Sequence, residues 1–261
     1  MSWLRIKAVA RRHAYVLQRS PHRLFDVTIW PLVDVLMFGS LAVFLAGASP
    51  QQAAFGYVLS GVLLWQIVYQ AQISLSTGFL EEAWSRNLLN LMVTPLREVE
   101  YVLGVALFGV VKLVIGLGVV TLTAVTLYSF DISDLGLSLV PIAVVLLAVG
   151  SVISFFVIGL VLRFGSGAEA LAWGVLFLAL PLSGVFYPVR ALPWILRPIS
   201  QALPSTHAFE ATRSVIDGRG IDWSQLGLAY ALTVVAGVMA LAFLRHMLSQ
   251  FRRRGYVTRY S

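Results

Sequence analysis

Long apolar stretches dominate the chain from residue 26 onward, and short polar segments separate them. An α-helix needs about 20 residues to cross a hydrocarbon core about 30 Å thick, and six stretches reach or approach that length. We therefore expect an all-α membrane protein with six transmembrane helices. The expected spans are residues 26–46, 53–78, 101–127, 137–162, 168–187 and 226–248.

A different pattern occupies residues 1–25, where apolar and basic positions fall on separate faces of a helix. The basic face carries Arg5, Arg12 and Arg19, and the apolar face carries Trp3, Ile6, Ala10, Ala14 and Leu17. This pattern predicts an amphipathic helix in the cytoplasmic headgroup region that ends at Ser20-Pro21. A cleavable signal peptide is the alternative, but the following apolar stretch is long for one and contains Asp34.

Composition and charge agree with this class. Of the 261 residues, 59% are hydrophobic and 12% are charged, whereas a soluble domain carries about 25% charged residues. The net charge is +7, and eleven of the 19 basic residues lie in two terminal blocks beside apolar stretches. This bias predicts both termini in the cytoplasm and no nucleic-acid partner. No polar segment is long enough for a core of its own, so residues 1–261 form one transmembrane domain.

Motifs for chemistry on this chain are missing. Its two lysines, Lys7 and Lys112, do not follow a glycine, so there is no phosphate-binding loop for ATP. The sequence has no cysteine and no HExxH pattern, which leaves no metal site to expect. We expect no cofactor on this chain and no enzymatic activity of its own.

The segment between the second and third spans, residues 79–100, has the pattern of a short amphipathic helix on the cytoplasmic side. Glu81 and Glu82 suit a first helical turn, and Thr94-Pro95 would end the helix. Such a helix either lies on the bilayer or inserts into a groove of a partner protein. The candidate coupling residues are Glu81, Glu82, Trp84, Arg86, Leu88, Leu91, Thr94 and Pro95.

The segment between the last two spans, residues 188–222, is too polar to cross a membrane and too apolar for a plain loop. It predicts two short helices that form a re-entrant hairpin and an outer gate, with Glu210 and Arg213 paired at i, i+3. His207 could serve as a proton relay, although no acid stands beside it in the sequence. The candidate gate residues are Phe186, Tyr187, Pro188 and His207.

Two stretches resemble the type-2 ABC exporter permease family, which exports drugs, nodulation factors and surface polysaccharides. They are residues 87–97 (NLLNLMVTPLR) and residues 182–188 (LSGVFYP), the latter followed by Leu192-Pro193 and by residues 203–207 (LPSTH). The second stretch is most similar to the drug and nodulation-factor branch. The resemblance implies a permease dimer in the bacterial inner membrane. It also implies two separate ATP-binding subunits, which hold ATP and Mg²⁺ and dock on the coupling loop.

Polar side chains inside the expected spans are the remaining candidates. Asp34 and Lys112 lie at similar depth with opposite charge, which predicts an ion pair between the first and third spans. Gln66, Gln70 and Ser74 share one face of the second span with Thr77. This face either hydrogen-bonds a neighbouring helix or lines a substrate route.

These features together favour an exporter permease that moves an amphipathic substrate (a drug, lipid or glycolipid) by alternating access. An export permease for polysaccharide is the nearest alternative. Rivals of another class are a proton-coupled secondary transporter that uses Asp34, a membrane-embedded enzyme, and a non-catalytic assembly subunit. The enzyme would need acid, histidine or metal-binding groups converging at one depth, and the sequence shows no such group.

Overall fold

The fold is described from a computed structural model that covers residues 2–48, 52–84, 95–96, 98–130, 136–165 and 169–254. Within these ranges every regular element is helical. The elements are α1 (Trp3–Gln18), α2 (Pro21–Ala48), α3 (Gln52–Trp84), α5 (Glu98–Tyr128), α6 (Leu139–Phe164), α7 (Glu169–Leu182), the 3₁₀ turn η3 (Val189–Ala191), α8 (Arg197–Gln201), α9 (Pro204–Ile216) and α10 (Trp223–Arg254). The expected all-α class is confirmed.

Five of these helices, α2, α3, α5, α6 and α10, are long and apolar enough to cross a membrane. They match five of the six expected spans. The other expected span, residues 168–187, contains α7, which has only 14 residues and is about 21 Å long at 1.5 Å per residue. This helix ends after Pro181, and Gly184 has a positive φ of 63°. The described part of the chain therefore has no sixth helix that crosses by itself.

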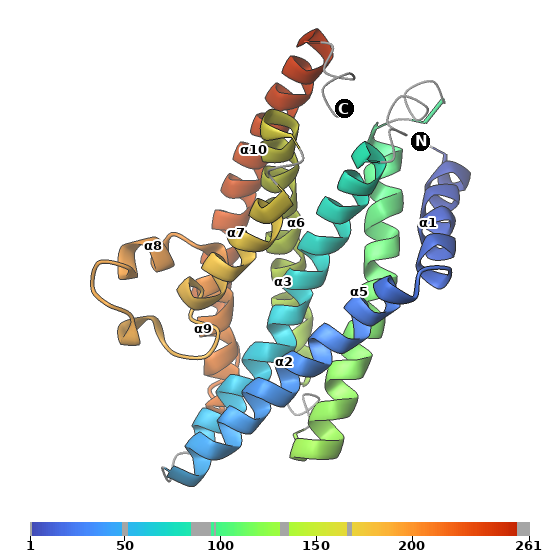
Figure 1. Ribbon diagram of the computed structural model, residues 1–261. Helices are drawn as coiled ribbons and strands as arrows, with labels where there is room; N and C mark the ends of the chain where they lie inside the picture. The colour runs from blue at the N-terminus through green and yellow to red at the C-terminus, as the bar shows by residue number, and fades with distance from the viewer. Residues whose placement is uncertain are drawn as a thin grey trace.

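The central element is α3, which packs against α2, α5 and α6 and runs through the middle of the bundle (Figure 1). In its apolar segment, Phe55–Leu80, 83% of the residues are buried, compared with 22–50% in the other four candidate spans. The outer helices thus shield α3 from lipid on most of its surface. This position allows α3 to carry polar side chains that a lipid-facing helix could not.

Two glycines, one in α3 and one in α6, allow the backbone of neighbouring segments to pack closely around α3. A Cβ atom at Gly61 of α3 would lie 2.5 Å from the carbonyl oxygen of Val185, which follows α7. A Cβ atom at Gly150 of α6 would lie 2.5 Å from the carbonyl oxygen of Val68. Small residues at such contacts let helix backbones approach each other and gain van der Waals contact.

The first residues form a helix, as expected, and one of its faces packs on the bundle. The helix α1 packs against α5 and buries Ile6, Val9, His13 and Leu17. Its basic residues Lys7, Arg11 and Arg12 are exposed, as is Arg19 directly after it. The helix α1 ends at Gln18, next to the expected end at Ser20-Pro21. The helix α2 begins at Pro21, earlier than the expected span at residues 26–46, whose apolar segment is Val27–Phe44. Proline suits the first position of a helix, where its missing N–H would have no partner anyway.

The second expected boundary was also wrong. The helix α3 continues through residues 79–84 instead of ending at Gly78. Glu81 and Glu82 therefore lie in the last turns of α3 and do not begin a new helix. Figure 1 shows that the start of α1, the end of α3, the start of α5 and the end of α10 lie at the same end of the bundle.

We predict that Gly150→Ala destabilises the protein, because the added methyl group would overpack the contact between α6 and α3. Overpacking of this kind costs about 1–3 kcal/mol. The matched control is Gly118→Ala in α5, where a Cβ atom would meet nothing within 4 Å. Thermal unfolding in detergent checks both variants. Equal melting temperatures for the two variants would contradict the close-packing account.

Candidate transport site

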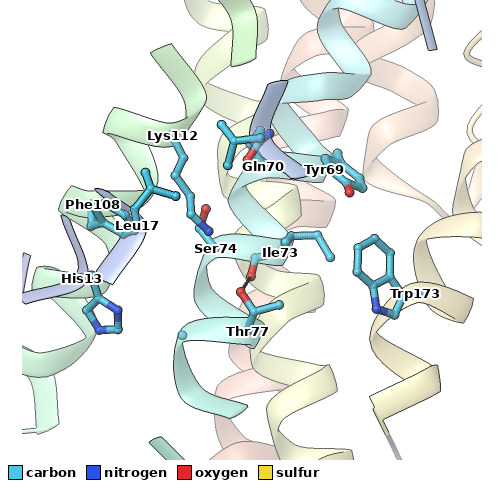
Figure 2. A pocket seen from close by; sticks show the side chains of 12 residues that line it. His13, Leu17, Tyr69, Gln70, Ile73, Ser74, Thr77, Phe108, Lys112 and Trp173 are labelled. Carbon is cyan, nitrogen blue, oxygen red and sulfur yellow. Dashed lines mark hydrogen bonds between the residues drawn. The ribbon is translucent and has the colours of Figure 1, made fainter. Parts of the chain in front are cut away.

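A polar cavity of about 100 Å³ lies between α1, α2, α3, α5 and α7. Figure 2 shows it with Lys112 of α5 on one side and Trp173 of α7 on the other. The described residues that line it are His13, Leu17, Val27, Tyr69, Gln70, Ile73, Ser74, Thr77, Gly78, Phe108, Lys112 and Trp173. It is small, and its volume corresponds to a few water molecules at about 30 Å³ each.

Aromatic rings support the polar groups of this cavity. The Lys112 Nζ atom lies 5.6 Å from the centroid of the Phe108 ring, within the range of a cation–π contact. The His13 ring stacks on the same phenylalanine with 5.7 Å between centroids. On the other side of the cavity, the ring centroids of Tyr69 and Trp173 lie 6.1 Å apart. The cavity thus combines a cation with aromatic walls in a region otherwise built from aliphatic side chains.

The polar face of α3 supplies the other hydrogen-bonding groups. Gln66, Gln70 and Ser74 are 1%, 2% and 3% exposed, so the stripe expected on this span faces protein rather than lipid. Gln66 Nε2 donates a hydrogen bond to Asp34 Oδ2 of α2 at 3.0 Å. The interpretation that the stripe bonds a neighbouring helix therefore holds for Gln66. Gln70 and Ser74 line the cavity instead.

The two intramembrane charges occupy different levels of this polar face. Asp34 lies at Gln66, whereas Lys112 lies in the cavity with Gln70 and Ser74, one and two helical turns further along α3. The ion pair between Asp34 and Lys112 stays a prediction. Sequence reasoning missed the Asp34–Gln66 contact, because depth alone does not give the rotation of a helix about its axis.

At the other end of the bundle, Arg213 of α9 holds the segment that follows α7. Its Nη2 group donates hydrogen bonds to the carbonyl oxygens of Gly184 and Tyr187, the latter at 2.8 Å. Its Nη1 atom lies 3.0 Å from Glu210 Oε1, so the expected i, i+3 pair is confirmed. Ser183 and Ser205 also share a hydrogen bond of 2.7 Å. These contacts join the broken end of α7 to α9.

Three of the four candidate gate residues, Phe186, Tyr187 and Pro188, lie at this junction. Phe186 stacks on Phe38 of α2 with 4.3 Å between ring centroids. The Tyr187 hydroxyl donates to the carbonyl oxygen of Pro181 at 2.9 Å. Pro188 lines a neighbouring hollow of about 290 Å³ whose other lining residues are Tyr57, Arg190, Glu210, Arg213, Asp217 and Arg219. In this hollow the Tyr57 hydroxyl donates to Asp217, which links α3 to the end of α9.

His207 has a local structural explanation. Its Nδ1 atom lies 2.7 Å from Gln225 Oε1 of α10, and its Nε2 atom lies 2.8 Å from the carbonyl oxygen of Gln201. Neither partner is an acid, so these contacts do not form a proton relay. They tie α8, α9 and α10 together at one point.

The coupling segment is described only at its two ends. Arg86, Leu88, Leu91 and Thr94 lie outside the described residues, and of Glu81, Glu82 and Trp84 only the helical backbone is described. At the other end, the carbonyl oxygen of Pro95 accepts a hydrogen bond of 2.5 Å from the Arg5 guanidinium.

A charged contact that sequence reasoning missed lies beside this segment. Glu100 of α5 is 1% exposed and accepts a 2.7 Å hydrogen bond from the backbone N–H of Ser2. Its other carboxylate oxygen lies 3.3 Å from Arg5 Nη1. The first turn of α1 is thus fixed to the end of the coupling segment. The sequence did contain a signal for this contact, because Glu100 is an acid next to the third span and the first 25 residues carry basic side chains and no acid.

Five long apolar helices around a buried polar face define a multi-pass membrane protein. A comparison with protein-family models matches residues 5–216 to the ABC-2 type transporter family. The match covers most of the chain, which therefore belongs to this family of ABC transporter membrane subunits. No curated protein matches the sequence closely enough to add a named relative.

We predict that Arg213→Gln loosens the junction between α7 and α9. Hydrogen bonds to a charged group contribute about 1.5–3 kcal/mol each, and glutamine cannot replace all three contacts. Hydrogen exchange of residues 184–204 should become faster. Arg219→Gln is the control, because its ion pair with Asp217 lies at the surface and such pairs contribute about 0–1 kcal/mol. Unchanged exchange in Arg213→Gln would contradict the role of this contact.

A double-mutant cycle tests the Asp34–Gln66 hydrogen bond. We predict that Asp34→Asn and Gln66→Leu are coupled by about 0.5–2 kcal/mol in thermal stability, since the residues are in direct contact. A second cycle with Asp34→Asn and Lys112→Met tests the expected ion pair. Additive losses in the first cycle would show that the Gln66 contact does not stabilise the protein, and additive losses in the second would rule out the ion pair.

Proposed function

We propose that this chain is the permease subunit of an ATP-driven exporter and works with a separate ATP-binding subunit. The observation that carries the proposal is the family match over residues 5–216. The missing phosphate-binding loop supports it, because the nucleotide must then bind another chain. Two copies of the permease and two ATP-binding subunits would form the working assembly.

The contacts of Glu100 provide the route by which the ATP-binding subunit would act. A partner that moves the segment around residues 85–94 also moves Pro95 and Glu100, and both are bonded to Arg5 of α1. The helix α1 in turn contributes His13 and Leu17 to the polar cavity. A movement of the coupling segment would therefore change the shape of the cavity through α1 and α5.

The break between α7 and α9 is the second moving part in this proposal. Val185 contacts Gly61, which lies six residues inside the apolar segment of α3, Phe55–Leu80, or about 9 Å deep. Backbone without helical hydrogen bonds is tolerated at that depth only where protein surrounds it. Arg213 satisfies two of the free carbonyl groups there. We assign this junction, with Phe186, Tyr187 and Pro188, as the outer gate of an alternating-access cycle.

The cavity and the outer gate lie along the same helix, and Gln66, Gln70 and Ser74 of α3 mark the path between them. The substrate would be amphipathic, because the cavity presents polar groups beside aromatic walls. The basic residues on α1 and at the end of α10 support a bacterial inner-membrane location with both termini in the cytoplasm.

Co-purification with each ATP-binding subunit encoded near its gene tests the proposal. We predict a stable complex whose ATPase activity in lipid nanodiscs requires the coupling segment, so that a Trp84→Ala, Leu88→Ala double variant loses binding or turnover. Glu100→Gln should keep the complex but lower turnover several-fold, because the link from the segment to α1 is weakened.

The control is Arg219→Gln, whose surface ion pair with Asp217 lies near the start of α3, at the other end of that helix from the coupling segment. It should leave assembly and turnover unchanged. If no ATP-binding subunit associates and the double variant behaves like the unaltered chain, the exporter proposal is wrong. A proton-coupled transporter that uses Asp34 would then be tested.

A further inference from the structure

An apolar groove of about 300 Å³ runs between α1, α3, α5 and α6. Apart from two serines, the described residues that line it are apolar or aromatic. Leu103 and Val110, on its α5 side, are 39% and 45% exposed, so the groove is open to the surroundings of the bundle. In a membrane, apolar surface of this kind is covered by lipid chains or by another protein.

The groove has the length and direction of one lipid chain. On α5 it extends from Leu103, the first residue of the apolar span, to Leu113. Ten residues at 1.5 Å each give about 15 Å, which is half of a hydrocarbon core about 30 Å thick. Ile6 of α1 packs at Gly104, so α1 borders the end of the groove near the membrane surface. The groove therefore follows α5 from one surface of the membrane toward its middle.

A column of alternating aromatic and basic side chains follows α1 from the mouth of the groove. Trp3, Lys7, Arg11 and Tyr15 recur every four residues, and all four are exposed. The Lys7 Nζ atom lies 5.4 Å from the centroid of the Trp3 ring, and the Arg11 Cζ atom lies 5.3 Å from that of Tyr15. Aromatic rings of membrane proteins gather at headgroup level, and long basic side chains extend to the same level. This column therefore has the composition of a contact with lipid headgroups.

The charge at the mouth of the groove distinguishes a lipid from a second copy of the chain. Residues 1–25 contain no acid, and Glu100 of α5 is buried and bonded to Ser2 and Arg5. Lys7 and Arg11 thus present positive charge that complements a phosphate group. A twofold contact between two copies through this face would bring two basic columns to one interface, where like charges oppose binding.

We propose that the groove and the column together bind one phospholipid from the leaflet that surrounds α1. An acyl chain lies in the groove, and the phosphate lies at Lys7. Trp3 joins the two parts, because it lines the groove and also carries the Lys7 ammonium group over its ring. The lipid fills the space between α1 and the helices α3, α5 and α6, and an acidic headgroup binds more tightly than a zwitterionic one. This inference goes beyond the proposed function, since the lipid is a part of the fold and not a cargo.

Native mass spectrometry of the purified full-length chain tests the site without ATP or a partner subunit. The detergent-purified chain is mixed with equal amounts of phosphatidylglycerol and phosphatidylcholine that have the same acyl chains. The expected result is one retained lipid per chain, with a preference of about fivefold for phosphatidylglycerol, the effect of one basic residue beside an anionic lipid. Equal retention of the two lipids would overturn the headgroup assignment.

Two variants separate the chain site from the headgroup site. Ala106→Phe fills the groove and should abolish retention of both lipids, whereas Lys7→Gln should keep one lipid and lose the preference. The control for the first is Ala231→Phe, at an exposed position of α10. The control for the second is Arg163→Gln, which is also exposed beside an aromatic ring, 5.2 Å from the centroid of Phe164, but does not line the groove. An altered variant that behaves like its control would overturn the proposal.

A crosslinking experiment on the unaltered chain covers the case in which Ala106→Phe does not fold. Phosphatidylglycerol with a photoreactive group halfway along one acyl chain should label residues 103–113 of α5. Labelling confined to other helices would overturn the proposal. A dimer that forms without lipid and is lost in Ala106→Phe would assign the groove to a second copy and would also overturn it. None of these outcomes bears on whether an ATP-binding subunit associates, so the site and the exporter proposal fail separately.

Discussion

The structure depends on one constraint: the polar side chains of α3 must be buried among other helices, because the protein lies in a membrane. Amides and hydroxyls facing hydrocarbon would each lack a partner, and water is not there to supply one. The helix α3 carries such groups at Gln66, Gln70 and Ser74, and α2, α5 and α6 surround it. The glycines at Gly61 and Gly150 follow from the same constraint, since they let the neighbouring backbones close around α3.

The polar face of α3 is only partly satisfied by hydrogen bonds in the described part of the structure, where Gln66 Oε1 and the Ser74 hydroxyl have no partner. Gln66 meets Asp34, and that hydrogen bond holds α2 against α3. Two turns further along α3, Ser74 keeps a hydroxyl without a partner in the described structure, beside Lys112. A buried hydroxyl without a partner lowers the stability of the fold. The packing around this polar face is therefore incomplete at Ser74 within the described part of the structure.

Much of this arrangement could be predicted from the sequence. The long spans, the amphipathic α1, the Glu210–Arg213 pair and the shared face of Gln66, Gln70 and Ser74 all follow from local spacing. The end of α1 beside Ser20-Pro21 was also predicted, but Pro21 additionally begins α2. The boundary at Gly78 failed, because this glycine does not break α3. Contacts such as Asp34–Gln66 and Arg5–Glu100 could not be found, because they depend on the rotation and tilt of whole helices.

The hydrogen bonds that Arg213 donates at this junction depend little on pH. A guanidinium keeps its proton at any pH that a cell encounters, and its acceptors at Gly184 and Tyr187 are backbone carbonyls that do not titrate. A histidine or a carboxylate in the same place would switch with acidity. The two hydrogen bonds from Arg213 to these carbonyl groups therefore contain no group that switches with acidity.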